Sequence, residues 1–387
     1  MAEIQGRPLR VGDRFSGAVR DLSSSGDGVV AHANGQVFFV PGVWTGEAGE
    51  FQITAFKGRS GTARLLTLLE PSPWRVEPPC PHHGFERNHC GGCAWQFVAY
   101  EQQLQAKQER LRRALVGLDD EEALRPIWGS PETLGYRNRA QLKSDGRRLG
   151  FVARGSNDIA SIDDCLVLNT ANRNTLAALV ARLPNRDWQA ERRKTWTTLD
   201  IDDEIDEQAV VPNLRRPFRQ GNSAQNRRMQ AWLAEQLREI GPGGPVLELF
   251  AGSGNFTEVL ANATPAAIIA IDSFAPAVHQ LEQRSLPGVV TRVLNLSRAE
   301  AAGEIARQLA DAELLVLDPP REGLRHSEEF LRAGKKLRNA IYISCDLATF
   351  VRDCRHFLNA GFRLIELQPL DMFPHTPHIE TLALLRR

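Results

Sequence analysis

The most constraining feature of the sequence is an alternation of apolar runs and helical segments that begins near residue 240 and continues to the C-terminus. The apolar runs are typical of buried strands: "GPVLELF", "AAIIAID", "VVTRVL", "AELLVLDPP", "NAIYISC", "FRLIELQPL" and "IETLALLRR". The connection before the last run, "DMFPHTPH", is too short for a crossover helix, so the final strand should return antiparallel. The pattern predicts an α/β domain over residues 241–387, with five parallel strands and a reversed final pair.

Two further regions precede this domain. Residues 1–72 contain short β-rich runs separated by Gly, Asn and Ser turns, which predicts a five-stranded barrel of the oligonucleotide-binding (OB) type. A proline-rich connector, "PSPWRVEPPCP", marks a boundary after the barrel. Residues 73–240 have mixed α+β character and include a long polar amphipathic helix expected over 93–117. We therefore expect three domains.

Composition limits the protein class without defining a function. The formal net charge of the 387 residues is zero, and 41 of the 47 basic residues are Arg. Arginine suits phosphate binding and base stacking, although a GC-rich genome also favours arginine codons. No apolar run approaches the roughly 18 residues of a membrane span, and the N-terminus has no apolar signal core. We expect a cytoplasmic protein that does not enter a membrane, with a monomer as the default.

Polar residues and glycines follow the predicted parallel strands at their carboxyl ends. Gly252 and Gly254 allow the backbone to approach a ligand closely after the first strand. Asp272 ends the second strand, where a carboxylate can accept both hydroxyls of a ribose, and Asn295 after the third can bind an adenine edge. Loop glycines and helix caps are the alternative interpretation. Because no phosphate-binding lysine accompanies the loop, S-adenosylmethionine fits better than a nucleoside triphosphate. The strand pattern is that of a class I (Rossmann-like) methyltransferase sheet.

A thiol and two carboxylates share this sheet edge. Cys345 follows the fifth strand, Asp318 ends the fourth, and Glu380 opens the reversed strand, which begins where its parallel neighbours end. A thiolate that adds to carbon 6 of a uracil makes carbon 5 nucleophilic toward a methyl donor, and a base must then remove the carbon 5 proton. We predict Cys345 as the nucleophile and Glu380 as the base. Cys354, within the next helix, is expected to pack as a small apolar residue.

Several motifs resemble the RNA 5-methyluridine methyltransferases: "SCDLATFVRD", "LDPPREG", "LFAGSGNFT", "RPFRQGNSAQNRRM" and "LDMFPHTPHIETLALL". The segments "DLSSSGDGVV" and "FVPGVWTGE" resemble the TRAM domain of that family, an OB-type barrel. The resemblance implies the same roles for Cys345 and Glu380. It also implies cofactor contacts from Gln220, Phe250, Asn255, Asp272, Asn295 and Asp318. The RNA substrate is then 23S ribosomal RNA or, as the alternative, transfer RNA.

The sequence departs from the family pattern at two positions near the predicted site. Asp346 follows the nucleophile, where the family usually has Asn, and a second carboxylate there disfavours a thiolate unless it caps the following helix. Gly221 replaces a usual β-branched residue after Gln220. The stretch 170–215 is also shorter than in many relatives, which leaves RNA docking open.

Four other cysteines have the character of metal ligands. "CPHHGFERNHCGGC" places Cys80, Cys90 and Cys93 together, and Cys165 lies far downstream. Four thiolates can hold a [4Fe–4S] cluster or a zinc ion, and neighbouring histidines could enter either set: His82, His83 and His89. The resemblance favours a [4Fe–4S] cluster on all four cysteines.

Recognition of RNA requires the target base to leave its stack. The basic segment "GYRNRAQLK", with Arg137, Arg139 and Lys143, is a candidate phosphate grip, although an exposed strand face would have the same composition. Two other functions remain open. One is an RNA cytosine-C5 methyltransferase, for which we find no motif for an acid at ring nitrogen 3, and the other is a non-catalytic RNA-binding factor.

Overall fold

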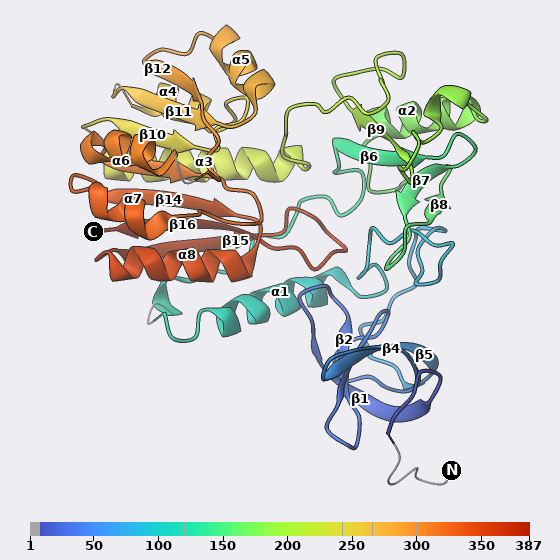
Figure 1. The fold of residues 1–387 in the computed structure, drawn as a ribbon. Coiled ribbons are helices and arrows are strands. Elements are labelled where there is room, and N and C mark those ends of the chain that lie inside the picture. Colours follow the sequence, from blue (N-terminus) through green and yellow to red (C-terminus); the bar gives the residue numbers. More distant parts are fainter. Residues whose placement is uncertain (1–7, 119–120, 242, 265, 299–300) are drawn as a thin grey trace.

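The computed structural model describes residues 8–118, 121–241, 243–264, 266–298 and 301–387, which form a barrel, a central region and a large α/β domain (Figure 1). Within these residues, five strands close the barrel in the order β1-β2-β3-β5-β4. Alternate side chains of the strands point inward, and Phe38 and Phe51 are fully buried in the barrel core. The bounds are β1 Arg14–Leu22, β2 Gly28–Ala31, β3 Val37–Val40, β4 Ala48–Lys57 and β5 Ser60–Glu70.

The helix that we predicted over residues 93–117 is shorter in the structure, where α1 spans Tyr100–Ala114. Residues 94–97 form turns instead. The reason is tertiary: Trp95 is buried against Trp44 of the barrel and donates its indole N–H to the Gly26 carbonyl at 3.0 Å. The segment before α1 thus joins the barrel to the rest of the chain.

The central region contains, among its described residues, a four-stranded antiparallel sheet in the order β8-β7-β6-β9. Helix α2 packs against β9, and the core between them includes Leu176 and Leu199. The bounds are η1 Glu121–Ala123, β6 Arg139–Ser144, β7 Leu149–Val152, β8 Ile159–Ser161, α2 Thr170–Ala181, η2 Arg186–Trp188 and β9 Thr197–Asp202.

The α/β domain confirms the predicted class I fold. Seven described strands form one sheet in the order β12-β11-β10-β13-β14-β16-β15, and β16 runs antiparallel to both β14 and β15. The strand bounds are β10 Val246–Leu249, β11 Ile268–Asp272, β12 Val289–Val293, β13 Leu314–Leu317, β14 Asn339–Ser344, β15 Arg363–Leu370 and β16 Glu380–Arg386. The helix bounds are α3 Ser223–Ile240, α4 Thr257–Ala263, α5 Ala275–Gln283, α6 Ala301–Asp311, α7 Ser327–Ala333 and α8 Leu347–Asn359.

Helices cover both faces of this sheet, which explains why its central strands are mostly apolar, with Glu248 of β10 as an exception. One apolar cluster joins the sheet to α6, α7 and α8, with Ile305 and Phe350 in its core. A second joins the opposite face to α3 and α4, through Trp232 and Leu260. The carboxyl ends of the parallel strands point toward the central region (Figure 1), so the chemistry predicted for this edge faces the other domains. None of the described helices has the length and apolar character that crossing a membrane requires.

Candidate active site

Strand register brings Cys345 and Glu380 together. β14 ends at Ser344, and Ser344 pairs with Thr381 of the antiparallel strand β16. Cys345 is the next residue after Ser344 and Glu380 is the residue before Thr381, so both leave the sheet at the same edge. The carboxyl group of Glu380 is buried, whereas Cys345 is half-buried. The reversed last strand is therefore what places a carboxyl group beside the thiol.

Burial and neighbouring charges shift the ionisation of both groups. Burial, with Glu380 and Asp318 adding to it, raises the pKa of the Cys345 thiol to about 12. Burial and Asp318 likewise raise the pKa of Glu380 well above its usual range, and Arg321 opposes the shift at both groups. The thiol therefore holds its proton at neutral pH in the free protein, and ionisation of Glu380 is disfavoured. A positively charged ligand at this edge would favour the ionised forms.

Cys345 opens into a cavity of about 530 Å³, a size that suits a small ligand or a single base. Its wall is built from four parts of the chain: the barrel loop with Ser24 and Ser25, the cysteine motif with Gly91 and Gly92, α1 with Arg110, and the hairpin residue Arg154. Arg321 and the segment 376–379 complete it. Three arginines thus line the cavity into which the thiol opens. Sequence reasoning missed all three, and only Arg321 had a local signal, because it follows Asp318 in "LDPPREG".

The loop after β10 has the tight geometry expected of a cofactor loop. Phe250, Gly252 and Gly254 all have positive φ angles, of 63°, 57° and 93°. A Cβ atom on Gly254 would lie 2.4 Å from a methyl group of Leu281, so a larger residue does not fit there. The Asp272 carboxylate braces the loop, since it accepts the Gly252 N–H at 2.9 Å and the Phe274 N–H at 2.8 Å.

Gln220 reaches the same edge from the segment before α3. Its side-chain amide donates to Asp318 at 3.2 Å, which joins two residues that are 98 positions apart. Burial, together with Asp272, raises the pKa of Asp318 to about 7. Gln220 also lines a second cleft, of about 700 Å³, between the central region and the α/β domain.

The two predicted asparagines have different surroundings. Asn255 exchanges two hydrogen bonds with Asn226 of α3, at 2.8 and 2.9 Å, so its side chain fixes the loop to that helix. Asn255 shares the larger cleft with Gln220. Asn295 is exposed after β12, and its side chain accepts the Ser297 N–H at 3.1 Å.

The structure accounts for both departures from the family pattern. Asp346 is the N-cap of α8, and its carboxylate accepts the Thr349 N–H at 3.0 Å. That carboxylate is thus turned into the helix terminus. At Gly221, a Cβ atom would lie 2.9 Å from the ring of Phe373, so the glycine is required for close packing of this loop.

Sequence reasoning also missed Glu248, a buried carboxyl group in the middle of β10. Burial raises its pKa to about 8, and Asp318 and Asp272 add to the shift. A lone acid within the apolar run "VLELF" was the available signal.

The basic residues predicted to grip phosphate are largely occupied within the protein. Arg137 donates to the Arg139 carbonyl at 2.9 Å, and Arg139 donates to the Pro217 carbonyl at 3.0 Å. Lys143 donates to the Thr198 hydroxyl at 2.9 Å. All are half-buried, so they are not an exposed basic strand face.

The four remaining cysteines meet around one small cavity. Cys80, Cys90, Cys93 and Cys165 all line it, together with His82 and His83. Burial raises the pKa of the Cys90 thiol to about 11, with Cys165 and Cys80 adding to the shift. His82 is engaged by Asp163, at 2.7 Å. As they stand, the described residues contain no group of three or more His, Cys, Asp or Glu side chains placed to hold a metal ion.

Comparison with known proteins gives consistent matches. Residues 178–387 match the family model described as tRNA (Uracil-5-)-methyltransferase. The chain is 43% identical to an uncharacterized RNA methyltransferase of Nitrosomonas europaea, over 95% of this chain and 96% of that protein. It is 30% identical to the 23S rRNA (uracil(1939)-C(5))-methyltransferase RlmD of Halomonas elongata, over 95% and 88% of the two chains. The fold is similar to that of the Pyrococcus abyssi tRNA (uracil-54, C5)-methyltransferase in complex with S-adenosyl-L-homocysteine, with a TM-score of 0.69, 20% identity and coverage of 96% and 99%.

Proposed function

This chain belongs to the RNA (uracil-5-)-methyltransferase family, and we propose that it transfers a methyl group from S-adenosylmethionine to carbon 5 of one uridine in 23S ribosomal RNA. The observation that carries the mechanism is the register of β14 and β16, which joins Cys345 and Glu380 at the edge occupied by the glycine loop. We assign the cofactor contacts to the six predicted residues, five of which lie at or after the ends of parallel strands while Gln220 bonds to one of them: Gln220, Phe250, Asn255, Asp272, Asn295 and Asp318.

The reaction that fits these side chains is a nucleophilic addition and elimination. When bound, S-adenosylmethionine supplies the methyl group as an electrophile. Once ionised, the Cys345 thiolate would add to carbon 6 of the extruded uracil, and carbon 5 would then form a bond to the methyl carbon as the bond from that carbon to the sulfonium sulfur breaks, which leaves S-adenosylhomocysteine. The Glu380 carboxylate removes the proton from carbon 5, and the bond between sulfur and carbon 6 breaks to release the thiolate. Arg321 favours the ionised forms that both steps need, because its charge lowers the pKa of the thiol and of the carboxyl group.

Ribosomal RNA is favoured over transfer RNA by the relatives. The 23S rRNA enzyme of Halomonas elongata is 30% identical to this chain, whereas the tRNA enzyme of Pyrococcus abyssi is 20% identical. The Cys345 cavity also has walls from the barrel and from the central region, which suits a splayed RNA loop held by several domains. We assign RNA contacts to the barrel (1–72) and the central domain (73–240), methyl transfer to residues 241–387, and the complete reaction to a monomer in the cytoplasm.

The test is methylation of RNA from a strain that lacks the gene. The protein is incubated with labelled S-adenosylmethionine and total RNA, and the methylated nucleotide is located by mass spectrometry. We expect 5-methyluridine at one position in 23S ribosomal RNA. Label in transfer RNA would contradict the substrate, label in 5-methylcytidine would contradict the base, and no transfer would favour a binding factor.

Two cysteine variants make a matched control for the mechanism. Cys345→Ala should abolish methyl transfer and covalent trapping on RNA that contains 5-fluorouridine. Cys354→Ala changes a cysteine buried within α8, so it should retain both activities. Trapping by the Cys345→Ala protein would assign the nucleophile to another residue.

We further propose that Cys80, Cys90, Cys93 and Cys165 hold a [4Fe–4S] cluster. Four thiols that line one cavity match the number and type of ligands that such a cluster takes. Because methyl transfer moves no net electrons, the cluster would serve structure or RNA contact. Protein prepared without oxygen should be brown and contain iron and sulfide, and Cys165→Ser should lose the colour. A colourless protein that contains zinc would contradict the cluster.

A further inference from the structure

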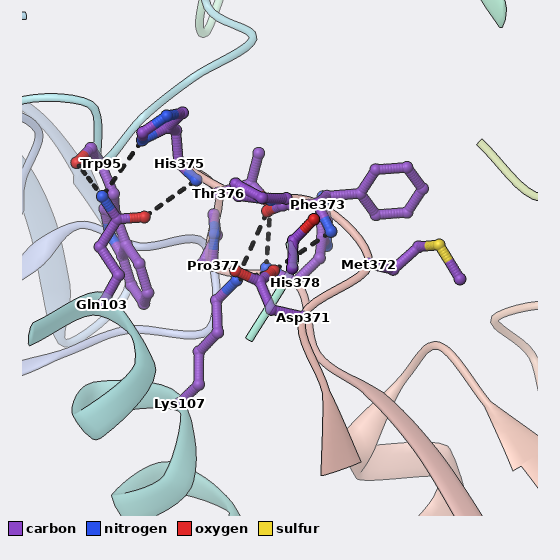
Figure 2. Close-up of polar contacts among 12 residues, drawn as sticks. Trp95, Gln103, Lys107, Asp371, Met372, Phe373, His375, Thr376, Pro377 and His378 are labelled. Carbon is purple, nitrogen blue, oxygen red and sulfur yellow. Dashed lines mark hydrogen bonds and ion pairs between the residues drawn. The ribbon is translucent and has the colours of Figure 1, made fainter. Parts of the chain in front are cut away.

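Helix α1 presents one polar face to the loop 371–379, which connects β15 to Glu380. Gln103, Lys107 and Arg110 are spaced by four and three residues, so they lie on the same face of the helix. Figure 2 shows Gln103 and Lys107 directed at successive parts of the loop. The function described above leaves this contact unexplained.

Lys107 is the centre of the contact. Its ammonium group is fully buried and donates to Asp371 at 2.6 Å and to the Phe373 carbonyl at 3.4 Å. Asp371 also accepts the Tyr100 hydroxyl at 2.9 Å and the Phe373 N–H at 3.1 Å. A buried ion pair often gives no more net stability than apolar residues of the same size. The main effect of this pair is therefore geometric, because its hydrogen bonds fix the first turn of the loop.

Gln103 holds the middle of the loop. Its side-chain oxygen accepts the His375 N–H at 2.9 Å, and its amide nitrogen lies 3.2 Å from Nδ1 of the same residue (Figure 2). The amide also donates to the carbonyls of Trp95 and Val98, at 3.1 and 2.8 Å. His375 has a φ angle of 66°, in the left-handed region that is unfavourable for a side chain of this size. Such a conformation persists only where the surroundings impose it.

Arg110 fixes the end of the loop nearest the proposed base. Its guanidinium donates to the Pro377 carbonyl at 2.9 Å, three residues before Glu380. On the other side, Glu380 pairs with Leu370 in the register of β15 and β16. The loop is thus held by the sheet at both ends and by α1 along its length.

We propose that α1 is a positioning element for methyl transfer, in which Lys107 fixes the loop 371–379 and so holds the Glu380 carboxyl toward Cys345. The inference rests on the proposed function, because it takes Glu380 as the base that removes the carbon 5 proton. Lys107 bonds to the loop, so it acts through Glu380 and is a positioning residue. Displacement of a reacting group by about 1 Å can cost on the order of 100-fold in rate. Loss of Lys107 should therefore slow adduct release more than adduct formation.

The experiment uses the full chain with the variant Lys107→Met/Asp371→Asn, which removes both buried charges together and leaves no unpaired one. Adduct formation on uridine RNA and release of methylated RNA are followed by rapid quenching and denaturing gels. We expect adduct formation near the wild-type rate and release slower by about 10- to 100-fold, so that the adduct accumulates. Gln103→Leu tests the same loop with no change in charge, and the same split is expected.

Two controls frame the result. Gln105→Met lies on the exposed side of α1 and should behave as the wild type, while Glu380→Gln should accumulate adduct because the base itself is lost. Release at the wild-type rate in both loop variants, or an equal slowing of formation and release, would overturn the positioning role. A wild-type protein that forms no adduct would instead overturn the proposed function, and the inference with it. If the double variant does not fold, the rates of adduct formation and release in Gln103→Leu alone test the positioning role.

Discussion

The protein contains two buried polar clusters that handle charge in opposite ways. In the clamp formed by α1 and the loop 371–379, the fully buried Lys107 and Asp371 neutralise each other at 2.6 Å. At the carboxyl edge of the sheet, Asp318 and Glu380 are gathered beside the Cys345 thiol, and each carboxyl group disfavours ionisation of its neighbours. The first cluster is balanced in the free protein, whereas at the carboxyl edge Arg321 only partly offsets the effect of burial and of the neighbouring carboxyl groups.

The difference separates a structural role from a chemical one. A buried pair whose charges balance needs no ligand, so its role is to fix geometry. The carboxyl edge avoids repulsion by keeping protons, as the elevated pKa of Asp318, about 7, and of Glu248, about 8, indicate. A cation such as a sulfonium would replace those protons, so the edge is suited to bind one. Chemistry is therefore expected where the charge is unbalanced.

The largest expected effect comes from removing one carboxylate from each cluster. Asp371→Asn leaves the Lys107 ammonium buried without its counter-charge, which should lower the free energy of unfolding by about 3–5 kcal/mol. Asp318→Asn removes a group that repels its neighbours, so at pH 8 stability should be unchanged or increased. Urea unfolding of both variants measures the contrast. Equal losses would show that the two clusters do not differ in this way.

The variant Glu248→Gln tests the carboxyl edge through the pH dependence of the free energy of unfolding. The folded protein binds a proton at Glu248 up to about pH 8, whereas the unfolded chain releases it near the usual carboxyl pKa. The folded state thus binds more protons over this range, and the free energy of unfolding should fall by roughly 1.4 kcal/mol per pH unit from about pH 4.5 to 8 because of this group. The variant should lose that slope and be more stable than the wild type at pH 8. Thermal unfolding of the ligand-free protein at pH 5 and 8 measures it, and parallel curves would contradict the assignment.

Sequence patterns predicted the main groups of the carboxyl edge, although they missed Glu248 and Arg321. The short connection "DMFPHTPH" predicted the reversed last strand, and the reversal alone brings Cys345 and Glu380 to one place. The glycine loop and Asp272 were predicted in the same way, because each lies where a predicted strand ends. These features are local, because each depends on where one strand stops.

The contacts between α1 and the loop 371–379, and the residues that line the Cys345 cavity, could not be predicted from strand ends. Lys107 and Asp371 are 264 residues apart, and the sequence shows only a lysine in a polar helix and an aspartate in a loop. Nothing local marks Arg110 or Arg154 as neighbours of Cys345, because three domains must pack before they meet. The same packing explains why α1 is shorter than predicted, since Trp95 packs against the barrel.

Cofactor binding should depend on pH through Asp318. Because its pKa is raised to about 7, the carboxylate forms as pH rises through neutrality, and affinity for the sulfonium of S-adenosylmethionine should rise with it. The expected gain is roughly tenfold between pH 6 and 8, with a smaller gain for S-adenosylhomocysteine, whose sulfur carries no positive charge. Asp318→Asn should bind more weakly and with little pH dependence. Titration calorimetry at both pH values checks this, and an unchanged slope in the variant would assign the proton to another group.

The smallest expected effect tests whether Asp346 belongs to the unbalanced edge or to the fold. Its carboxylate accepts the Thr349 N–H at 3.0 Å as the N-cap of α8, and Asn caps a helix about as well as Asp. Asp346→Asn should therefore keep both stability and the rate of adduct formation. Asp346→Ala should lose about 1 kcal/mol in urea unfolding, because the cap is removed. If Asp346→Asn instead speeds adduct formation, the Asp346 charge does act on the Cys345 thiol, and the unbalanced cluster extends one residue beyond the proposed nucleophile.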